Sequence, residues 1–474
     1  MVCNDVEWHY RGEGNCALVV ADPQNRKVYR LVKKYFTQRL NQGSCQDTFV
    51  SKRELIDAAL RHIVDYVRNV MQPLLYSKYV DSPEMTVIED IFVKKVQPAV
   101  SDSRPVHRRN TSPDTLDGVA RSALVLPDVC FISQTPEILE CNKEHDVTTI
   151  SIEIKPKKAL LPHYQLQDGG SPVKRQVCKF CMHQKLKVKE YKWPQTSQYC
   201  PLDLFSGNRA RMLHALLCLI KTPQNNLKIC QNGTEVYGAG AMRDLGAVLK
   251  DFFGDSGQCK NSHVLMFLDL VIEILLSTQQ NDNLLESTML KKKCYNSSFV
   301  SRNGESLTGV LPPGCVLERI FTVQAMDHLH IQNILPLYQK ILTHLEHHPE
   351  DRLKWGLDGP YTRELWPTST DSKRDLCPSS IEYAVDKVKR FLISKTVQDC
   401  SVIVAIQPCR KGISKENSTI SMNSQCFSYS IALVDLDPKP FDKIQSYYLQ
   451  DLKITKAFQE TFDLSTDGNE SSDL

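Results

Sequence analysis

The chain has 474 residues, of which 41% are hydrophobic and 24% are charged, and its formal net charge is +3. These values are typical of folded globular proteins and exclude a fibrous repeat or a wholly disordered chain. The small net charge gives no whole-chain attraction to nucleic acid or to a membrane surface. At roughly 150 residues per domain, the length indicates about three domains, or two large ones.

Cysteine usage and hydropathy indicate the compartment. The 17 cysteines are scattered without regular spacing, which favours reduced thiols over a secreted disulfide framework. The first apolar run, residues 17–21, is too short for the core of a signal peptide. The most apolar stretch, residues 265–276, contains Asp269 and Glu273 and is predicted to be an amphipathic core helix, not a membrane span. We therefore expect a protein of the cytoplasm and nucleus.

The first hundred residues mix strand and helix signals, and a small α+β unit is predicted over residues 1–100. Its expected elements are a glycine-containing turn at residues 11–15, strands at residues 16–21 and 28–32, and a long helix from Leu55 to Met71. Ser51 is the expected N-cap of this helix, and Glu54 three residues later completes a capping box.

The rest of the chain alternates predicted strands and helices up to an acidic tail at residues 465–474. The predicted strands are residues 123–126, 148–154, 227–230, 236–237, 401–406 and 427–437, and the predicted helices are residues 177–188, 209–220, 321–345 and 381–393. Asn232 and Gly233 form a hairpin turn signal between two of these strands. Residues 277–309 are polar and are predicted to be a surface insertion, and residues 407–425 form a polar connector.

Positive charge is concentrated between residues 151 and 193. This segment contains ten lysines and arginines but only three acidic residues, which gives it a local net charge of +7. On a strand, alternate residues share a face, so Glu153, Lys155 and Lys157 are expected to point to one side. Pro156 suits the end of a strand or an edge strand.

The helix that follows adds a second row of cations. Lys179, His183 and Lys187 are spaced by four residues and share one helix face. Two such rows fit a ligand that carries several phosphates, whereas a solvated basic face has the same pattern. Cys178 and Cys181 form a C-x₂-C pair here, but with His183 they supply fewer than the four ligands of a structural zinc site.

A glycine-containing segment precedes the first two strands. Gly12 and Gly14 would let backbone N–H groups approach phosphates closely, although an ordinary hairpin turn needs the same residues. Arg30, on the next strand, is placed to reach nucleotide phosphates as a lysine does in protein kinases; a surface arginine is the simpler alternative.

Two acidic groups lie at strand ends. Asp435 and Asp437 share a face at the end of an apolar strand, where carboxylates commonly hold Mg²⁺; turn formation by Asp-Pro is the alternative. Asp399 precedes the strand at residues 401–406 and is a candidate to orient or deprotonate a hydroxyl group, with capping as the alternative.

In their order along the chain these segments resemble the inositol-pentakisphosphate 2-kinase family. The matching segments are residues 12–15, 153–157, 181–187, 199–207, 224–228, 399–401 and 435–440. The resemblance extends from residue 8 to about residue 453. It implies an ATP- and Mg²⁺-dependent kinase that phosphorylates the 2-hydroxyl of inositol 1,3,4,5,6-pentakisphosphate to give inositol hexakisphosphate. It also implies a two-lobed α+β fold, distantly similar to protein kinases, with an N-lobe at residues 1–100 and an enlarged C-lobe at residues 101–464.

The resemblance also implies roles for individual residues. The ATP site would contain Gly12, Glu13, Gly14, Asn15, Arg30 and Glu153. The inositide phosphates would be held by Lys155, Lys157, Lys179, Lys187, Asn225, Asn226, Lys439, Lys443 and Tyr447, and by one of Arg104 and Arg108. Asp399 would be the catalytic acid–base group, and Asp435 with Asp437 would bind Mg²⁺. Lys179 and Lys443 stand where the plant enzymes carry arginine, which keeps the charge but loses bidentate geometry.

We expect a monomer that binds inositol pentakisphosphate and requires neither membrane nor nucleic acid. One alternative is a non-catalytic scaffold that binds inositol polyphosphates, which would keep the cations without consuming ATP. A second is RNA binding through the basic segment, where few aromatic residues are available for base stacking. A protein kinase is disfavoured because the H-R-D-x-x-x-x-N and D-F-G motifs are absent from the sequence.

Overall fold

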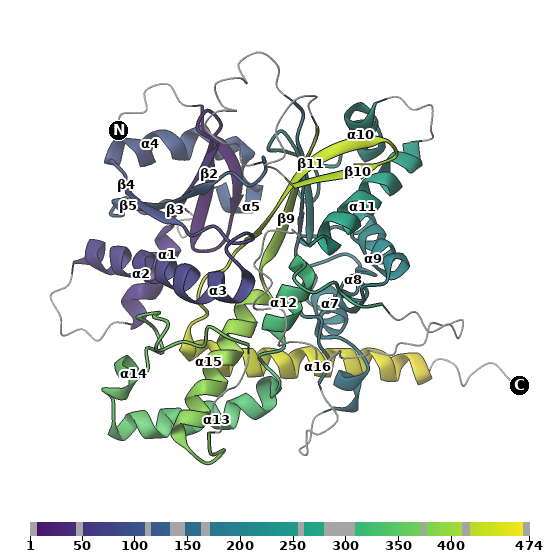
Figure 1. The fold of residues 1–474 in the computed structure, drawn as a ribbon. Coiled ribbons are helices and arrows are strands. Elements are labelled where there is room, and N and C mark those ends of the chain that lie inside the picture. Colours follow the sequence, from purple (N-terminus) through teal and green to yellow (C-terminus); the bar gives the residue numbers. More distant parts are fainter. Residues whose placement is uncertain are drawn as a thin grey trace, which may run out of the picture.

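The computed structural model describes residues 7–43, 51–109, 115–132, 147–162, 171–254, 260–278, 309–370, 376–409 and 418–467. In this part of the chain two antiparallel β-sheets are surrounded by helices (Figure 1), which confirms the α+β class. The predicted tail from residue 468 and nearly all of the predicted insertion, residues 279–308, lie outside the described residues.

The first sheet has five strands in the order β1-β2-β3-β5-β4. Their bounds are His9–Glu13 for β1, Ala17–Asp22 for β2, Lys27–Val32 for β3, Glu84–Val87 for β4 and Ser122–Pro127 for β5. Leu31 and Val32 of β3 point to opposite faces, so Leu31 packs with Trp8 and the α4 side chain of Val96, whereas Val32 packs with Leu60 of α2. The strand β5 shows that this sheet extends beyond residue 100.

Of the helices around the first sheet, only the long one over residues 55–71 was predicted from the sequence. Their bounds are Lys34–Gly43 for α1, Lys52–Tyr66 for α2, Val67–Met71 for the π-helical turn η1, Gln72–Leu75 for α3, Asp90–Ala99 for α4, Ser101–Ser103 for the 3₁₀ turn η2 and Val106–Arg109 for α5. Ser51 and Glu54 form the predicted capping box at the start of α2. The same helical segment packs on the first sheet through Ile56 and enters the large core of the second through Met71 and Leu74, so it ties the two parts together.

The second sheet has six strands in the order β10-β11-β9-β6-β7-β8. Their bounds are Ile150–Ile154 for β6, Leu227–Gln231 for β7, Thr234–Tyr237 for β8, Ser401–Pro408 for β9, Ser418–Met422 for β10 and Gln425–Val434 for β11. The β7–β8 turn at Asn232 and Gly233 has positive φ at both residues, as the sequence predicted. The polar connector at residues 407–425 contains β10, which the sequence analysis missed.

The largest hydrophobic core lies between the second sheet and its helices. The bounds are Pro172–Arg175 for the 3₁₀ turn η4, Lys179–Lys189 for α7, Pro201–Leu204 for α8, Arg209–Lys221 for α9, Leu245–Phe253 for α10, Lys260–Leu276 for α11, Val316–Gln324 for α12, His330–His347 for α13, Asp351–Lys354 for α14, Ile381–Val397 for α15, Phe441–Lys443 for the 3₁₀ turn η5 and Ile444–Asp467 for α16. As predicted, α11 is a core helix, with Phe267 and Val271 fully buried. Within the described residues, no helix is both long and apolar enough to cross a bilayer.

Two local predictions were wrong. The expected turn at residues 11–15 begins later, because Arg11, Gly12 and Glu13 belong to β1 and pair with β2 across a register shift. The single helix predicted over residues 321–345 is two helices, α12 and α13. The break is stabilised at the start of α13, where the Asp327 carboxylate accepts the backbone N–H of His330 at 2.9 Å.

Candidate active site

Strand register brings the predicted site residues to one edge of the second sheet. The strand β9 runs antiparallel to both β6 and β11, so its first residues lie beside the last residues of both neighbours. Ser401 pairs with Val434, and Val402 pairs with Ile154. The segments that flank these pairs therefore meet, and they carry the lysines after β6, Asp399 before β9 and the aspartates after β11.

Asp399 is the carboxylate at this edge of the sheet around which several lysines lie. It follows α15, and its backbone N–H donates to the Thr396 carbonyl oxygen at 3.0 Å. Its Oδ2 lies 3.4 Å from Lys439 Nζ. Burial would raise the pKa of Asp399, but Lys395, Lys439 and Lys157 outweigh it and lower the pKa to about 2. The carboxylate is therefore ionised at any physiological pH and is able to accept a proton.

Lys157 and Lys187 face Asp399 from two other elements. Burial lowers the pKa of both ammonium groups; each feels the repulsion of a neighbouring lysine, while Asp399 opposes the shift. Lys157 has a φ of 64°, which shows that the chain turns sharply just after β6. The same α7 face carries His183, whose pKa burial and the nearby lysines lower to about 4, so its ring is neutral at pH 7.

Both predicted metal-binding aspartates are paired with cations from other segments. Asp435, whose side chain is 57% exposed, lies 3.5 Å from Lys155 Nζ. Asp437 forms a bidentate ion pair with Arg30 of β3, 407 residues away in the chain, with Arg30 Nη1 2.7 Å from Oδ1. The Arg30 guanidinium lowers the pKa of Asp437 although burial opposes it. This pair joins the first sheet to the edge of the second.

In the glycine-containing segment at residues 12–15, which was predicted to approach phosphates, Glu13 is buried whereas Gly12 and Gly14 are open to a ligand. The Glu13 side chain is 1% exposed and is held by both Lys33 and Arg104. Arg104 donates from Nε to Glu13 Oε1 at 3.1 Å and from Nη2 to Oε2 at 2.8 Å. A Cβ atom on Gly12 or Gly14 would have no atom within 4 Å, so the backbone here is accessible to a ligand.

The structure distinguishes the two arginines that the sequence left open. Arg104 is 2% exposed and committed to Glu13. Arg108 lies nearer the surface, and it donates to the Gly14 carbonyl oxygen at 2.7 Å and to Asn15 Oδ1 at 3.1 Å. Arg108 is therefore the one positioned at the accessible loop.

Glu153 is bound to neighbouring strands of the second sheet. Its Oε2 lies 3.0 Å from Lys228 Nζ on β7, and its Oε1 accepts a hydrogen bond from the Ser401 hydroxyl at 2.8 Å. Burial would raise the pKa of Glu153, but Lys228 and Lys155 lower it to about 2. Lys228 also donates to the Arg11 carbonyl oxygen at 3.2 Å, which connects Glu153 to β1.

The two predicted asparagines have different environments. Asn225 is exposed, whereas Asn226 is 1% exposed and its carbonyl oxygen accepts the Lys155 N–H at 2.9 Å. Asn226 therefore fixes the backbone at the end of β6. Its Oδ1 has no hydrogen-bond partner among the described residues.

The other predicted inositide-binding residues lie around α16. Lys179 forms an ion pair at 2.6 Å with Asp451 of α16, and Tyr447 is half-buried near the start of this helix. Lys443, in η5, is exposed. The structure thus brings most of the predicted cations to one region, but several of them already have an aspartate partner.

Three cysteines form a cluster at the N-terminal end of α7. The Sγ atoms of Cys178, Cys181 and Cys200 are within 4.8 Å of one another, which is an arrangement that could hold a metal ion. Cys200 is the third ligand that the C-x₂-C spacing did not reveal, because it lies 19 residues beyond Cys181. Among the described residues the cluster offers three ligands, one fewer than a closed structural zinc site.

The partners that hold the site residues in place were not predicted from the sequence. They are Lys33, Lys228, Asp451 and Lys395. Lys228 carried one usable signal: it lies on the predicted strand at residues 227–230, where alternation places it on one face with Cys230. The pairing of that strand with β6 is a tertiary fact and was not available from the sequence.

The fold and the site define an α+β protein in which cations and carboxylates from distant segments converge at one sheet edge, an arrangement suited to a polyphosphorylated small molecule. A family model described as inositol-pentakisphosphate 2-kinase matches residues 10–453. The chain therefore belongs to the inositol-pentakisphosphate 2-kinase family.

Individual relatives agree with this membership. A protein of Danio rerio named inositol-pentakisphosphate 2-kinase is 33% identical, over 95% of this chain and 93% of its own length. A protein of Arabidopsis thaliana with the same name is 26% identical, over 94% and 92%. A third, of Drosophila melanogaster, is 28% identical over half of each chain.

Proposed function

We propose that the protein transfers a phosphoryl group from ATP to the 2-hydroxyl of inositol 1,3,4,5,6-pentakisphosphate, giving inositol hexakisphosphate. The observation that carries this proposal is an ionised Asp399 surrounded by lysines from four segments of the chain. An ionised carboxylate can accept the proton of a hydroxyl group, and the lysines attract the phosphates of the molecule that bears it. Family membership supports the same reaction.

In the proposed reaction the 2-hydroxyl oxygen forms a bond to the γ-phosphorus, the bond from that phosphorus to ADP breaks, and the hydroxyl proton moves to Asp399. Lys157 and Lys187 bind phosphates of the inositide and hold its hydroxyl group toward Asp399. Such a reaction needs little covalent chemistry from the protein and depends on positioning and charge stabilisation, which these side chains supply.

We place ATP against the accessible loop at Gly12, Gly14 and Asn15, with Arg30 and Glu153 near it. The exposed Asp435 carboxylate, with Asp437 two residues on, fits the hard oxygen ligands that Mg²⁺ prefers. When bound, Mg²⁺ would neutralise charge on the transferred phosphoryl group. Arg30 and Asp437 neutralise each other in this structure, so their roles toward ATP and metal require that this pair open.

A kinase of this family would have two lobes, distantly similar to those of protein kinases. The first sheet with its own cores would be the N-lobe, and the second sheet with the large core would be the C-lobe. Because β5 belongs to the first sheet, we place the boundary after residue 127 and not near residue 100. The monomeric state and the location in cytoplasm and nucleus stay predictions from the sequence.

The direct test is to incubate the purified protein with ATP, Mg²⁺ and inositol pentakisphosphate. The expected result is inositol hexakisphosphate in equal amount to the ADP formed, as measured by chromatography and a coupled ADP assay. A folded protein that binds the inositide without consuming ATP would support the scaffold alternative. Binding of RNA with a steep salt dependence, unaffected by Asp435→Ala, would support the nucleic-acid alternative.

Asp435→Asn is expected to lower turnover by about 10²–10³-fold and to raise the Mg²⁺ concentration needed for half-maximal rate, because one carboxylate of the metal site is lost. The measurement is the initial rate over a Mg²⁺ titration. Asp442→Asn is the matched control, because Asp442 is also exposed in the segment after β11 but pairs with Arg352 at the surface. An unchanged Mg²⁺ dependence in Asp435→Asn would exclude Asp435 as a metal ligand.

A further inference from the structure

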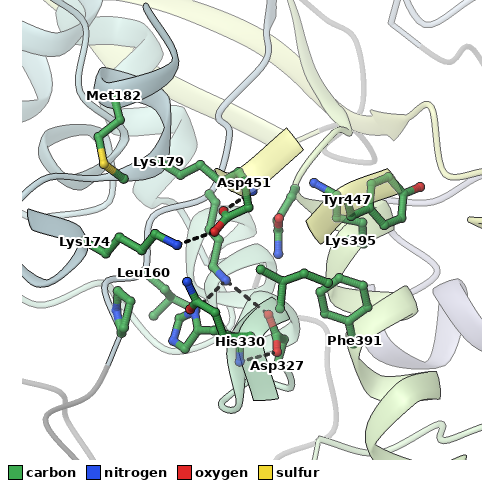
Figure 2. A pocket seen from close by; sticks show the side chains of 15 residues that line it. Leu160, Lys174, Lys179, Met182, Asp327, His330, Phe391, Lys395, Tyr447 and Asp451 are labelled. Atoms are coloured by element: carbon green, nitrogen blue, oxygen red, sulfur yellow. Dashed lines mark hydrogen bonds and ion pairs between the residues drawn. The ribbon is translucent and has the colours of Figure 1, made fainter. Parts of the chain in front are cut away.

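A cavity of about 50 Å³, shown in Figure 2, is lined by residues of α7, α13, α15 and α16. Two of its lining residues, Lys395 and Gln398, are close to Asp399 in the chain. This volume exceeds what one water molecule needs, so the cavity has room for a small polar group. Its charged lining residues are Lys158, Lys174, Lys179, Lys395, Asp327 and Asp451. His330 also lines it, but burial and Lys158 lower the pKa of its ring to about 3 and leave it neutral. The cavity therefore has a net charge of +2.

Three of the four lysines already have a carboxylate partner. Lys174 and Lys179 share Asp451, with distances of 2.5 Å and 2.6 Å from their Nζ atoms to its two oxygens, as the dashed lines in Figure 2 show. Lys158 Nζ lies 3.2 Å from Asp327 Oδ2. Both aspartates of the cavity are thus used by these three lysines.

Lys395 is the fourth cation, and it has no ion pair or hydrogen bond in the part of the chain that the structure describes. It projects from α15 beside Tyr447, with its Nζ 5.1 Å from the centre of the ring (Figure 2). It lies in the last turn of α15, four residues before Asp399, which follows the end of this helix.

A buried ammonium group without a direct ion pair among the described residues is unfavourable in such a place. Burial lowers the pKa of Lys395 to about 8; Asp399 opposes the shift, and Lys179, Lys439 and Lys158 add to it. A leucine or methionine would fill the same space on α15 without this cost. A cation kept under these conditions is characteristic of a functional site.

We propose that this cavity is a subsite for one phosphate group, that Lys395, which has no ion pair within the described residues, is its phosphate-binding cation, and that the phosphate it takes belongs to the inositide bound beside Asp399. The assignment to the inositide rests on the proposed function, whereas free orthophosphate has the same chemistry. Since Lys395 lies in the last turn of α15, four residues before Asp399, and its charge acts on that carboxylate, a phosphate held by Lys395 fixes how the inositol ring faces the proton acceptor. Lys395 is thus a positioning and specificity residue.

The test compares Lys395→Met with Lys395→Arg in calorimetric titrations of inositol pentakisphosphate into the full-length protein without ATP. Lys395→Met is expected to bind about tenfold or more weakly, because a charge-assisted hydrogen bond is lost, and Lys395→Arg is expected to recover most of the affinity. Lys354→Met, which removes the same charge from an exposed surface position, should bind as the wild type does. Equal affinity in Lys395→Met and wild type would overturn the proposal.

Proton uptake gives an independent readout. A lysine with a pKa of about 8 is partly deprotonated at about pH 8, and an incoming phosphate restores its proton. Wild-type protein should therefore take up about half a proton more than Lys395→Met on binding, as measured in buffers of different ionisation enthalpy. The other charged groups around Lys395 are unchanged in the variant. Identical proton uptake would contradict a ligand phosphate at Lys395.

Stability separates a ligand cation from a structural lysine. Because the pKa of Lys395 is lowered in the folded protein, its charged form disfavours folding below about pH 8, and this effect disappears as the pH rises through the unfolded value of about 10.4. Lys395→Met should therefore melt at the same temperature as wild type or higher at pH 7. A much lower melting temperature with unchanged inositide affinity would make Lys395 structural and refute the subsite.

Binding of orthophosphate and assays of turnover separate two questions: which molecule supplies the phosphate, and whether the protein is a kinase. If orthophosphate alone binds in a Lys395-dependent way while inositide affinity is unaffected, the assignment to the inositide is wrong. If wild-type protein binds the inositide through Lys395 but shows no turnover, the proposed kinase function fails and the subsite is still supported. Turnover in wild type with an unchanged KM in Lys395→Met would reject the subsite alone.

Discussion

Replacing Asp399 with asparagine is expected to lower the rate of inositol hexakisphosphate formation by about 10²–10⁴-fold, the usual contribution of a general base. Asparagine has the same size as aspartate and still accepts hydrogen bonds through Oδ1, but it cannot take up the hydroxyl proton. Because the substitution removes a negative charge beside Lys157, Lys395 and Lys439, inositide affinity should be unchanged or tighter. The loss is therefore expected in kcat and not in KM.

The measurement is steady-state kinetics with separate calorimetric titrations of nucleotide and inositide. Asp358→Asn is the control, because this exposed aspartate pairs with Arg352 at the surface. The lowered pKa of about 2 means that the wild-type carboxylate stays ionised from about pH 5 to about pH 9, so Asp399 adds no acidic limb to the rate profile in that range. Wild-type kcat in Asp399→Asn would show that another group accepts the proton.

The largest effect on stability is expected from Glu13→Gln, which should lower the free energy of unfolding by about 3–5 kcal/mol. The Glu13 side chain is 1% exposed and compensates two buried cations, Lys33 at 0% and Arg104 at 2% exposure. Glutamine removes the counter-charge that Glu13 supplies to both of these buried cations. The same substitution should weaken ATP binding, because Lys33 also donates to the Gly14 carbonyl oxygen and so holds the loop in place.

Urea unfolding followed by circular dichroism measures this change, and Glu84→Gln is the matched control. Glu84 is exposed on β4 of the same sheet, so its substitution should change stability by less than about 0.5 kcal/mol. Burial would raise the pKa of Glu13, but Arg104 and Lys33 lower it, so its stabilisation is present above the unfolded pKa and is lost as the pH falls through the folded pKa. The difference between Glu13→Gln and wild type should therefore shrink in acid. A loss within about 1 kcal/mol at pH 7 would show that the two cations find other partners.

Local patterns predicted much of the secondary structure, because they act within a few residues. The capping box of Ser51 and Glu54 and the hairpin turn at Asn232 and Gly233 form as predicted. The first depends on two reciprocal hydrogen bonds between residues three apart, and the second on φ above zero. The short strands β4 and β10 were missed because they are formed by pairing with a neighbour and have no apolar run of their own. The break between α12 and α13 was missed because it depends on Asp327, which also binds Lys158 from another segment.

The sequence by itself determined which residue types gather at the site. The concentration of lysines after residue 151, the aspartates at the ends of strands and the order of the matching segments were all visible in one dimension. They were enough to identify the family, since charge and motif spacing are properties of the chain and not of its folded shape. The net charge of the whole chain is only +3, whereas residues 151–193 alone have a net charge of +7, which is apparent from the distribution of charges along the chain.

Only the tertiary structure decided which partner each of these residues meets. It pairs Arg30 with Asp437, commits Arg104 to Glu13 while leaving Arg108 at the accessible loop, and gives Lys395 no direct ion pair among the described residues. The physical reason is that an ion pair forms where two side chains come within about 4 Å, and strand register and helix packing set that distance for residues hundreds of positions apart.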